Sequence, residues 1–453
     1  MNPPLQLVVA RAVDQPLPAL RFSASWTLAA SVIYAAAQWA MISAVAKLAS
    51  PAALGQFGLG LSIAAPVFML TNMQLRAVQA TDARSEHSFA DCFTLRCLGN
   101  LTGVVLILAV VALARYDRTT SAVILLVAAA RAIEQLSDVV AGRLQKFERL
   151  DQAARAQMLR GAASAVVFAL VLRASHSLLA AVCAFAAACA TVVLAYDFRL
   201  ARRLQDGGRN FLSSNRRALK RLAAASLPLG IVTALAVLNV NIPRYAVQHY
   251  LGPASLGIFV SVAYVLIATV NVIVNAMGLS ASARLAQMFA AGDLAGFNRV
   301  LRNLLFIGAA ITLLGTPLAL LWGRPLLSLV YRPEYAQHAP LLSMMAAVAG
   351  VSAVGMILGF AVTATRRFRS QLPVLGVATL AGFAAAVLLL PKYGLFGAAF
   401  ALLASSIVLV IGNGAILAMA ERAARARPGE GETSVRLTAM PADPALAAVL
   451  EGD

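Results

Sequence analysis

Charged side chains are scarce in this sequence. Asp, Glu, Lys and Arg make up 12% of the 453 residues, whereas 60% are hydrophobic. An ordinary soluble domain carries about 25% charged residues. The composition therefore excludes a soluble globular protein and indicates that lipid is the main solvent of the chain.

Sequence motifs for cofactor and hydrolytic chemistry are also missing. There is no GxxxxGK[ST] phosphate loop, no GxSxG elbow, no HExxH and no His/Cys cluster with metal-ligand spacing. The cysteines lie inside apolar runs without a CxxC spacing, which favours small buried hydrophobic side chains over ligands. They are Cys92, Cys97, Cys183 and Cys189. We expect no metal, no bound cofactor and no ATP hydrolysis by this chain.

Long apolar runs recur from Phe22 almost to the C-terminus. Each has about the 20 residues that a helix needs to cross a bilayer. The runs are continuously apolar, whereas the strands of a membrane barrel alternate polar and apolar positions. We predict an all-α polytopic protein of about twelve transmembrane helices, at 22–46, 54–75, 89–114, 119–141, 156–173, 177–197, 222–247, 255–280, 300–323, 339–364, 371–390 and 395–419.

The distribution of basic residues tests this count, because cytoplasmic loops are enriched in Lys and Arg. Of the 37 basic residues, most fall in loops on one side. The other side holds only Lys47, Arg115, Arg118, Arg173, Arg324, Arg332 and Lys392. The count therefore predicts that both termini are cytoplasmic.

A seven-residue motif occurs twice. Pro51-Ala-Ala-Leu-Gly-Gln-Phe57 reappears as Pro253-Ala-Ser-Leu-Gly-Ile-Phe259, each time between the first and second helix of a half. An even number of helices per repeat gives both halves the same orientation, with a cavity between them. We predict a cytoplasmic segment at 1–21, an N-terminal lobe at 22–197, a linker at 198–221, a C-terminal lobe at 222–419 and a disordered cytoplasmic tail at 420–453.

The linker at 198–221 is strongly basic. It carries Arg199, Arg202, Arg203, Arg209, Arg216, Arg217, Lys220 and Arg221. Basic clusters beside a membrane attract anionic lipid headgroups, by about 1 kcal/mol per residue. We therefore expect anionic phospholipids, and not nucleic acid, to be the partners of the net charge of +18.

Three charged residues share one predicted helix at spacings of three and four, which places them on one face. They are Arg131, Glu134 and Asp138. Charges inside a membrane cost about 2.5–3.5 kcal/mol each on insertion scales, so they need a partner or a function. One interpretation is an Arg131–Glu134 salt bridge that lets the helix insert. The other is a cavity in which Arg131 binds an anionic substrate and Glu134 or Asp138 couples a cation.

Two further arginines lie inside predicted helices near the cytoplasmic side. Arg96 could reach the interface with its long side chain, or could face the cavity and bind phosphate with its planar guanidinium. Arg160 lies close enough to the edge to serve as an anchor, so we leave it out of the predicted site.

Polar residues also mark the seventh and eighth helices. Asn239, Asn241 and Arg244 lie in the seventh, and Asn271 and Asn275 in the eighth. The amides could hydrogen-bond sugar hydroxyls, or they could join helices to one another. Pro228 and Gly230 weaken the start of the seventh helix and predict bending there.

These motifs resemble one family. The repeated Pro-Ala-x-Leu-Gly-x-Phe, the Ser226–Gly230 helix start, Asn241-Ile-Pro-Arg-Tyr245 and Ala290-Ala-Gly-Asp293 are similar to those of Wzx-type polysaccharide flippases. Wzx-type flippases belong to the multidrug/oligosaccharidyl-lipid/polysaccharide (MOP) exporter superfamily. The resemblance implies a V-shaped carrier that moves an undecaprenyl-pyrophosphate-linked oligosaccharide across a bacterial inner membrane by alternating access. It also implies that Arg96, Arg131 and Arg244 line the lumen.

The resemblance leaves the partners and the driving force open. We expect that an H⁺ or Na⁺ gradient drives transport and that the protein is a monomer. We expect other polysaccharide assembly proteins as partners.

One alternative to a flippase is a cation-coupled multidrug exporter that uses Glu134 and Asp138. Another is a membrane-embedded glycan polymerase or ligase, for which the longest outer loop, 324–338, offers few candidate residues. A non-catalytic assembly subunit would tolerate loss of the intramembrane charges. We expect a transporter and not an enzyme.

Overall fold

The computed structural model describes residues 20–82, 86–203, 211–264, 266 and 269–425. The predicted segment before residue 20 and the tail beyond residue 425 lie outside the described residues. Within the described ranges the chain is helical and contains no β-strand.

The first half of the chain forms six spans. They are α2 (Leu20–Leu48), α3 (Pro51–Asn72) with the short α4 (Leu75–Thr81), α5 (Phe89–Ala114), α6 (Arg118–Lys146), α7 (Leu150–Ser175) and α8 (Leu178–Val192). A π-helical turn (Val193–Asp197) and α9 (Phe198–Arg203) extend the sixth span.

The second half forms six more. They are the two parts of α10 (Arg216–Ala263), the second continued by α11 (Thr269–Ala290), then α12 (Leu294–Val330), α13 (Ala339–Ala364), α14 (Gln371–Tyr393) and α15 (Leu395–Arg425). Short 3₁₀ turns at Pro333–His338 and Phe368–Ser370 precede α13 and α14. Gly252, with φ 80° and ψ 178°, separates the two parts of α10, a conformation that favours glycine.

The predicted fold class is confirmed. Of the described helices, ten are long and apolar enough to cross a membrane. The charged helix α6 is not among these ten, but it packs against α3, α5 and α8 inside the bundle. The protein is therefore a multi-pass membrane protein, and its described residues are all-helical and form twelve helical spans.

Several helices extend beyond the predicted ends. Phe198–Arg203 and Arg216–Arg221, predicted as linker, are helical, and so is the predicted disordered tail up to Arg425. Asn215 caps α10 by accepting a hydrogen bond from the amide of Ala218. An ion pair of 3.6 Å between Glu421 and Arg425 stabilises the last turns of α15. Helix formers and caps thus continue these helices past the apolar runs that the prediction followed.

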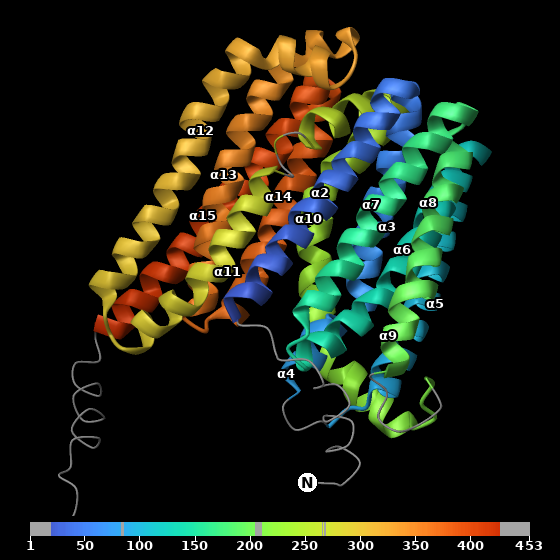
Figure 1. Ribbon diagram of the computed structural model, residues 1–453. Helices are drawn as coiled ribbons and strands as arrows, with labels where there is room; N and C mark the ends of the chain where they lie inside the picture. The colour runs from blue at the N-terminus through green and yellow to red at the C-terminus, as the bar shows by residue number, and fades with distance from the viewer. Residues whose placement is uncertain (1–19, 83–85, 204–210, 265, 267–268, 426–453) are drawn as a thin grey trace, which may run out of the picture.

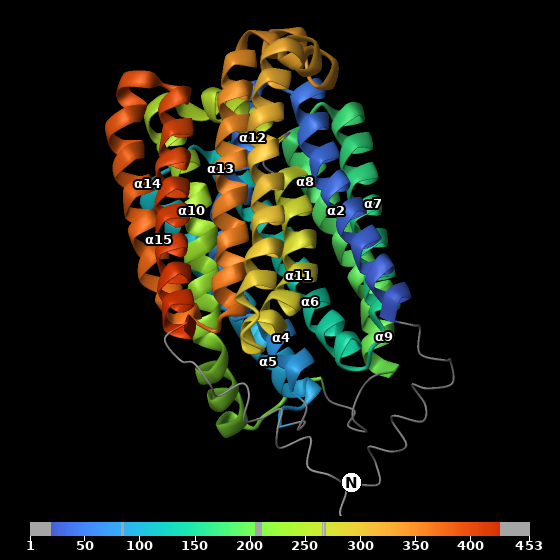
Figure 2. The ribbon, with the colours of Figure 1, turned by 90° about the vertical axis from the view of Figure 1, so that its left-hand side faces the viewer.

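Figures 1 and 2 show two bundles of helices. In the first bundle α2 packs against α7, and α6 packs against α3 and α8. In the second bundle α13 packs against α12 and α15, and α14 against α15. The bundles approach one another at one end and diverge at the end where α4 and α9 lie (Figure 1). The residue boundaries of the two lobes stay predictions.

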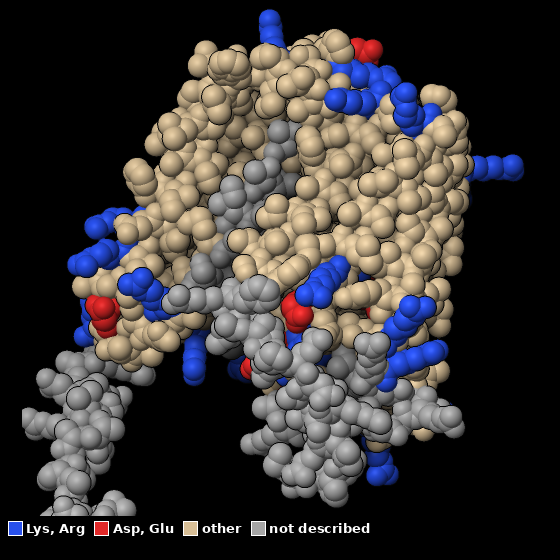
Figure 3. Space-filling model, in the orientation of Figure 1, with Lys and Arg blue, Asp and Glu red and all other residues tan. Residues whose placement is uncertain are grey.

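Lys and Arg side chains gather at the two ends of the molecule and leave a belt of other residues between them (Figure 3). We call the end with α4 and α9 the basic end. It also holds the turn between α6 and α7, which carries Lys146 and Arg149, and the start of α10. This distribution is the one expected for a protein that spans a membrane.

The two copies of the repeated motif pack against each other at the end opposite the basic end. A Cβ atom on Gly55 would overlap the carbonyl oxygen of Pro253, and one on Gly257 would overlap the carbonyl oxygen of Pro51. Leu54, Phe57, Leu256 and Phe259 beside them are buried. The contact is reciprocal, so the two halves are related by a local two-fold axis. Both motifs lie on one face, as the predicted even number of helices per half requires. We call this contact the glycine latch.

The latch generates a prediction about packing. We expect Gly55→Ala to lower the melting temperature in detergent, because an extra methyl group in a filled contact costs roughly 1–3 kcal/mol. Gly376→Ala in α14 is the control, since no atom lies within 4 Å of its added Cβ. Replacing glycine by alanine in a helix should there stabilise by at most about 1 kcal/mol. Equal melting temperatures for the two variants would contradict the latch.

Candidate functional site

A polar cavity of about 380 Å³ lies inside the first bundle. Helices α2, α3, α4, α6 and α7 supply its walls. Its polar lining residues are Tyr34, Asn72, Arg76, Arg131, Glu134, Gln135, Asp138, Gln157 and Arg160. Three arginines and two carboxylates therefore share one space within a predominantly apolar protein.

Arg131 and Glu134 form an ion pair in this cavity. Arg131 Nη1 lies 2.6 Å from Glu134 Oε2, and the hydroxyl of Tyr34 donates to Glu134 Oε1 at 3.1 Å. Arg131 also donates to the hydroxyl of Tyr34 at 2.9 Å and to Gln38 Oε1 at 3.0 Å. The predicted Arg131–Glu134 salt bridge is confirmed. Two side chains of α2 orient it, a contribution that helix spacing alone did not predict.

The hydrogen bonds of Arg131 do not use its full capacity. A guanidinium has five N–H donors. The bonds to Tyr34, Glu134 and Gln38 occupy three of them among the described residues. The side chain of Arg131 is 23% exposed. It can therefore still donate to an anion that enters the cavity.

Asp138 holds a second set of charges together. It lies 3.1 Å from Arg96 Nη2 and 3.6 Å from Arg76 Nη1. Arg96 is fully buried and also donates to Gln135 Oε1 at 2.8 Å. Neither interpretation drawn from the sequence describes Arg96, because it reaches neither the interface nor the cavity. It lies behind the cavity wall and positions Asp138.

Arg160 lines the cavity, although the sequence placed it at the membrane edge as an anchor. It donates to the hydroxyl of Ser137 and lies 3.5 Å from Asp197 Oδ2. Asp197 is buried at the end of the π-helical turn after α8. Such turns occur often at functional sites. The sequence did hold a signal for this pair. Arg160 lies near the start of one predicted helix, and Asp197 lies at the end of the next one.

Arg244 belongs to a separate cluster where α10 packs on α3. It donates to Asn241 Oδ1 at 2.9 Å and to Ser62 Oγ at 3.3 Å. Tyr245 donates to the carbonyl oxygen of Ser62. Asn241 in turn donates to the carbonyl oxygen of Val237 at 2.8 Å. This cluster joins the two halves of the chain across the α3–α10 contact.

The remaining predicted asparagines give less information. Asn239 is buried on α10. Asn271 and Asn275 lie on α11, but their side chains lie outside the described part of the structure. The interpretation of these asparagines as sugar-binding residues stays a prediction.

Tyr264 connects the cavity with the Arg244 cluster. It follows the Gly252 break and lies within electrostatic range of both Arg131 and Arg244. Arg131 lies on α6, Arg244 on the first part of α10, and Tyr264 directly after the end of α10. No group of metal ligands occurs among the described residues.

Comparison with known proteins establishes the class of fold. No protein-family model matches the chain. The fold is similar to a multidrug resistance MATE family transporter of the MOP superfamily in an inward-facing conformation, with a TM-score of 0.63 and 14% identity over 93% of this chain and all of that one. The lipid II flippase MurJ in an inward closed conformation gives 0.63 and 11%, with 93% of each chain covered. The chain thus has the MOP exporter fold, as predicted, and its structural relatives are transporters and not enzymes.

One relative comes from sequence comparison. The chain is 24% identical over 388 residues to the capsular polysaccharide biosynthesis protein CapF of Staphylococcus aureus. The match covers 85% of this chain and 96% of that protein. This similarity points in the same direction as the predicted resemblance to polysaccharide exporters.

The ion pairs around Asp138 generate a stability prediction. Asp138→Asn should lower the free energy of unfolding by roughly 1–3 kcal/mol, because buried Arg96 loses its charged hydrogen-bond acceptor. Asp117→Asn is the matched control, since asparagine also caps a helix well and Asp117 caps α6 through the amide of Thr120.

A double variant sharpens this test. Combining Asp138→Asn with Arg96→Met should recover part of the loss, because it removes the uncompensated charge as well. Thermal unfolding in detergent compares the wild type, the Asp117→Asn control, the two single variants Asp138→Asn and Arg96→Met, and the double variant. Additive losses in the double variant would contradict the pairing.

Proposed function

We propose that this protein flips a lipid-linked oligosaccharide, with an undecaprenyl-pyrophosphate carrier, across a bacterial inner membrane. The observation that carries the proposal is the arginine-rich cavity in a protein with the MOP exporter fold. The similarity to a capsular polysaccharide biosynthesis protein supports a saccharide cargo.

The charges of the cavity suit a diphosphate headgroup. Arg131 carries the cation that an anionic headgroup needs, and Glu134 neutralises it while the site is empty. A diphosphate that accepts hydrogen bonds from Arg131 would take the place of Glu134 as counter-charge. Glu134, 9% exposed at its side chain, would then require a cation of its own. A proton or Na⁺ meets that need and links flipping to an ion gradient.

The arrangement of helices suits alternating access. The glycine latch holds the bundles together at one end, while the helices diverge at the basic end (Figure 1). We assign the basic end and both termini to the cytoplasm, because basic loops stay on that side. In this conformation the cargo enters from the cytoplasmic leaflet, and release on the other side requires the latch to open. The proposal also includes anionic phospholipids bound at the basic end, polysaccharide assembly proteins as partners and a monomeric state.

A cation-coupled multidrug exporter is the second candidate. The similarity to MATE transporters favours it, as do the two carboxylates in the cavity. The three arginines oppose it, because their charge disfavours the binding of cationic drugs. Uptake of a fluorescent cationic drug into proteoliposomes separates the two candidates.

The proposed cargo generates a transport prediction. We expect Arg131→Gln to reduce leaflet-resolved movement of undecaprenyl-pyrophosphate oligosaccharide in proteoliposomes by roughly tenfold or more, since one charged hydrogen bond is worth about 1.5–3 kcal/mol. Arg173→Gln, which removes an exposed arginine outside the cavity, is the matched control. Arg131→Lys should retain part of the activity.

Two outcomes of this assay would contradict the proposal. One is movement of the lipid at the wild-type rate in Arg131→Gln protein of normal melting temperature. The other is absence of protein-dependent movement for several glycans together with transport of a cationic drug.

The proposed coupling generates a separate prediction. An imposed proton or Na⁺ gradient should accelerate flipping by the wild type. Glu134→Gln should remove this dependence, because the amide cannot be ionised. Rates measured with and without each gradient test the coupling. A variant that keeps the gradient dependence of the wild type would show that Glu134 is not the coupling group.

A further inference from the structure

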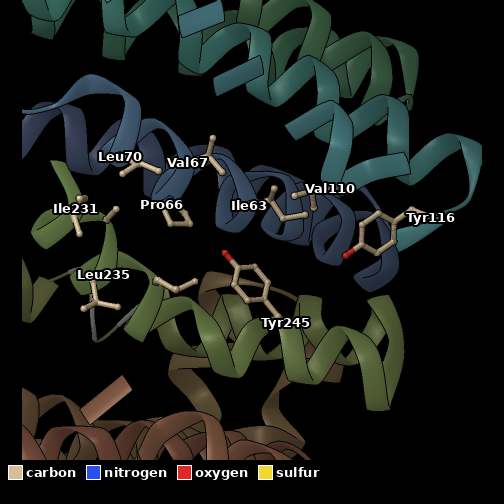
Figure 4. Close-up of a pocket in the computed structure, with 11 residues that line it drawn as sticks. Ile63, Pro66, Val67, Leu70, Val110, Tyr116, Ile231, Leu235 and Tyr245 are labelled. Atoms are coloured by element: carbon tan, nitrogen blue, oxygen red, sulfur yellow. The ribbon is translucent and has the colours of Figure 1, made fainter. Parts of the chain in front are cut away.

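An apolar groove lies on the other side of α3 from the polar cavity. Its volume is about 510 Å³, and its walls come from α3, α5, α10 and the turn after α5. On α3, Phe68 and Asn72 line the cavity, whereas Val67 and Leu70 line the groove. Figure 4 shows the side chains of α3 and α10 facing each other across the groove. Helix α3 is therefore a wall with a polar and an apolar side.

Only two groove residues carry polar side-chain atoms, Tyr116 and Tyr245. Tyr116 follows the end of α5, away from the basic end, and Tyr245 lies 14 residues beyond Ile231 on α10. The groove also separates α10 from Val110 near the end of α5. It thus follows the α3–α10 contact toward the latch end of the membrane.

A basic pocket lies beside the start of α10, at the basic end of the molecule. Its volume is about 840 Å³, and its charged lining comes from Arg217 and Arg221 on α10 and Glu86 before α5. No carboxylate among the described residues forms an ion pair with either arginine in this structure. His87 and Asn215 add polar atoms. The pocket thus lies between α10 and the residues before α5. The groove lies between α10 and the far end of α5.

Hydrogen bonds hold Glu86 and His87 next to Asp82. Asp82 accepts hydrogen bonds from the amides of Glu86 and His87, and it lies 3.6 Å from Lys146 Nζ. Partial burial alone would raise the pKa of Asp82, but these partners outweigh it and hold the pKa below its usual value. The pocket therefore has one wall on α10 and one at Glu86 and His87.

The pocket and the groove follow one another along α10, since the last pocket residue on this helix is Ala225 and the first groove residue is Ile231. The distance that they cover together argues for one occupant. From Arg221 to Tyr245 a helix rises about 36 Å, at 1.5 Å per residue. A phospholipid acyl chain fills one leaflet, about half of the 30 Å hydrocarbon core. A phospholipid with its phosphate near Arg221 therefore ends well before the two tyrosines. A polyprenyl chain is long enough to follow the whole path.

We propose that the path from Arg217 and Arg221 along α10 to Tyr116 and Tyr245 binds the lipid carrier of the cargo, a long-chain polyprenyl phosphate or diphosphate. The phosphate lies between the two arginines and the chain lies in the groove. The inference rests on the proposed function, since it specifies where the lipid carrier docks. The carrier is thereby collected next to the lobe contact that opens and closes during transport.

Photo-crosslinking tests the site. The protein carries the photoreactive amino acid p-benzoylphenylalanine in place of Leu235 in the groove, or in place of Leu380 as the control. Leu380 is 69% exposed on α14 and lies outside the groove. The probe is undecaprenyl phosphate at low mole fraction in phosphatidylethanolamine/phosphatidylglycerol liposomes. Mass spectrometry measures the ratio of polyprenyl to phospholipid adducts.

We expect this ratio to exceed the bulk ratio at position 235 and to equal it at position 380. Neutralising both arginines with Arg217→Gln and Arg221→Gln should reduce the enrichment by more than tenfold, because each basic residue at the surface contributes about fivefold. Ala234→Leu fills the groove and should abolish the enrichment. Ala236→Leu, on another face of α10, should leave it intact.

Bulk ratios at both positions would overturn the proposal, and so would enrichment of phosphatidylglycerol alone at position 235. The test is independent of transport. Enrichment at position 235 without flipping in proteoliposomes would refute the proposed function and leave the lipid site standing. Flipping with bulk adduct ratios would refute the lipid site alone.

Discussion

Compensation of buried charge is the constraint on which this structure depends. An arginine inside a membrane protein is costly unless a group beside it compensates its charge, and a carboxylate does this most strongly. Arg131 has Glu134, Arg96 has Asp138, and Arg160 has Asp197. These three pairs hold α5, α6, α7 and the end of α8 together around one polar space. The cavity thus follows from the way in which the first bundle satisfies its charges.

The fold was predictable because lipid imposes a simple rule on sequence. Apolar length and loop charge predicted the twelve spans, and the repeated Pro-Ala-x-Leu-Gly motif predicted that the two halves have the same orientation. The helix ends were less predictable, since caps such as Asn215 and the ion pair at Arg425 extend helices into polar sequence. The break at Gly252 falls in the predicted loop between the seventh and eighth helices, where a glycine and a proline follow one another.

The site was predictable only in part. Spacing on one helix placed Arg131 beside Glu134, but the contributions of Tyr34 and Gln38 depend on where the packing of α2 against α7 places those two side chains. The positions of Arg96, buried behind the cavity wall, and of Arg160, in the cavity lining, depend on packing in the same way. Their distance along the helix from the membrane edge was similar, whereas their neighbours were not. Tertiary packing decides which of two equivalent arginines faces a cavity and which supports its wall.

Helix α3 has a polar side and an apolar side, an arrangement that suits an amphipathic cargo. One side faces arginines and carboxylates, and the other faces a groove that is apolar up to two tyrosines. The most direct test of this account is a cryo-electron microscopy structure with a bound lipid-linked oligosaccharide. The account predicts diphosphate density within hydrogen-bonding distance of the Arg131 guanidinium, with Glu134 separated from it. Headgroup density outside both the Arg217–Arg221 pocket and the reach of Arg131, with the Arg131–Glu134 ion pair intact, would contradict it.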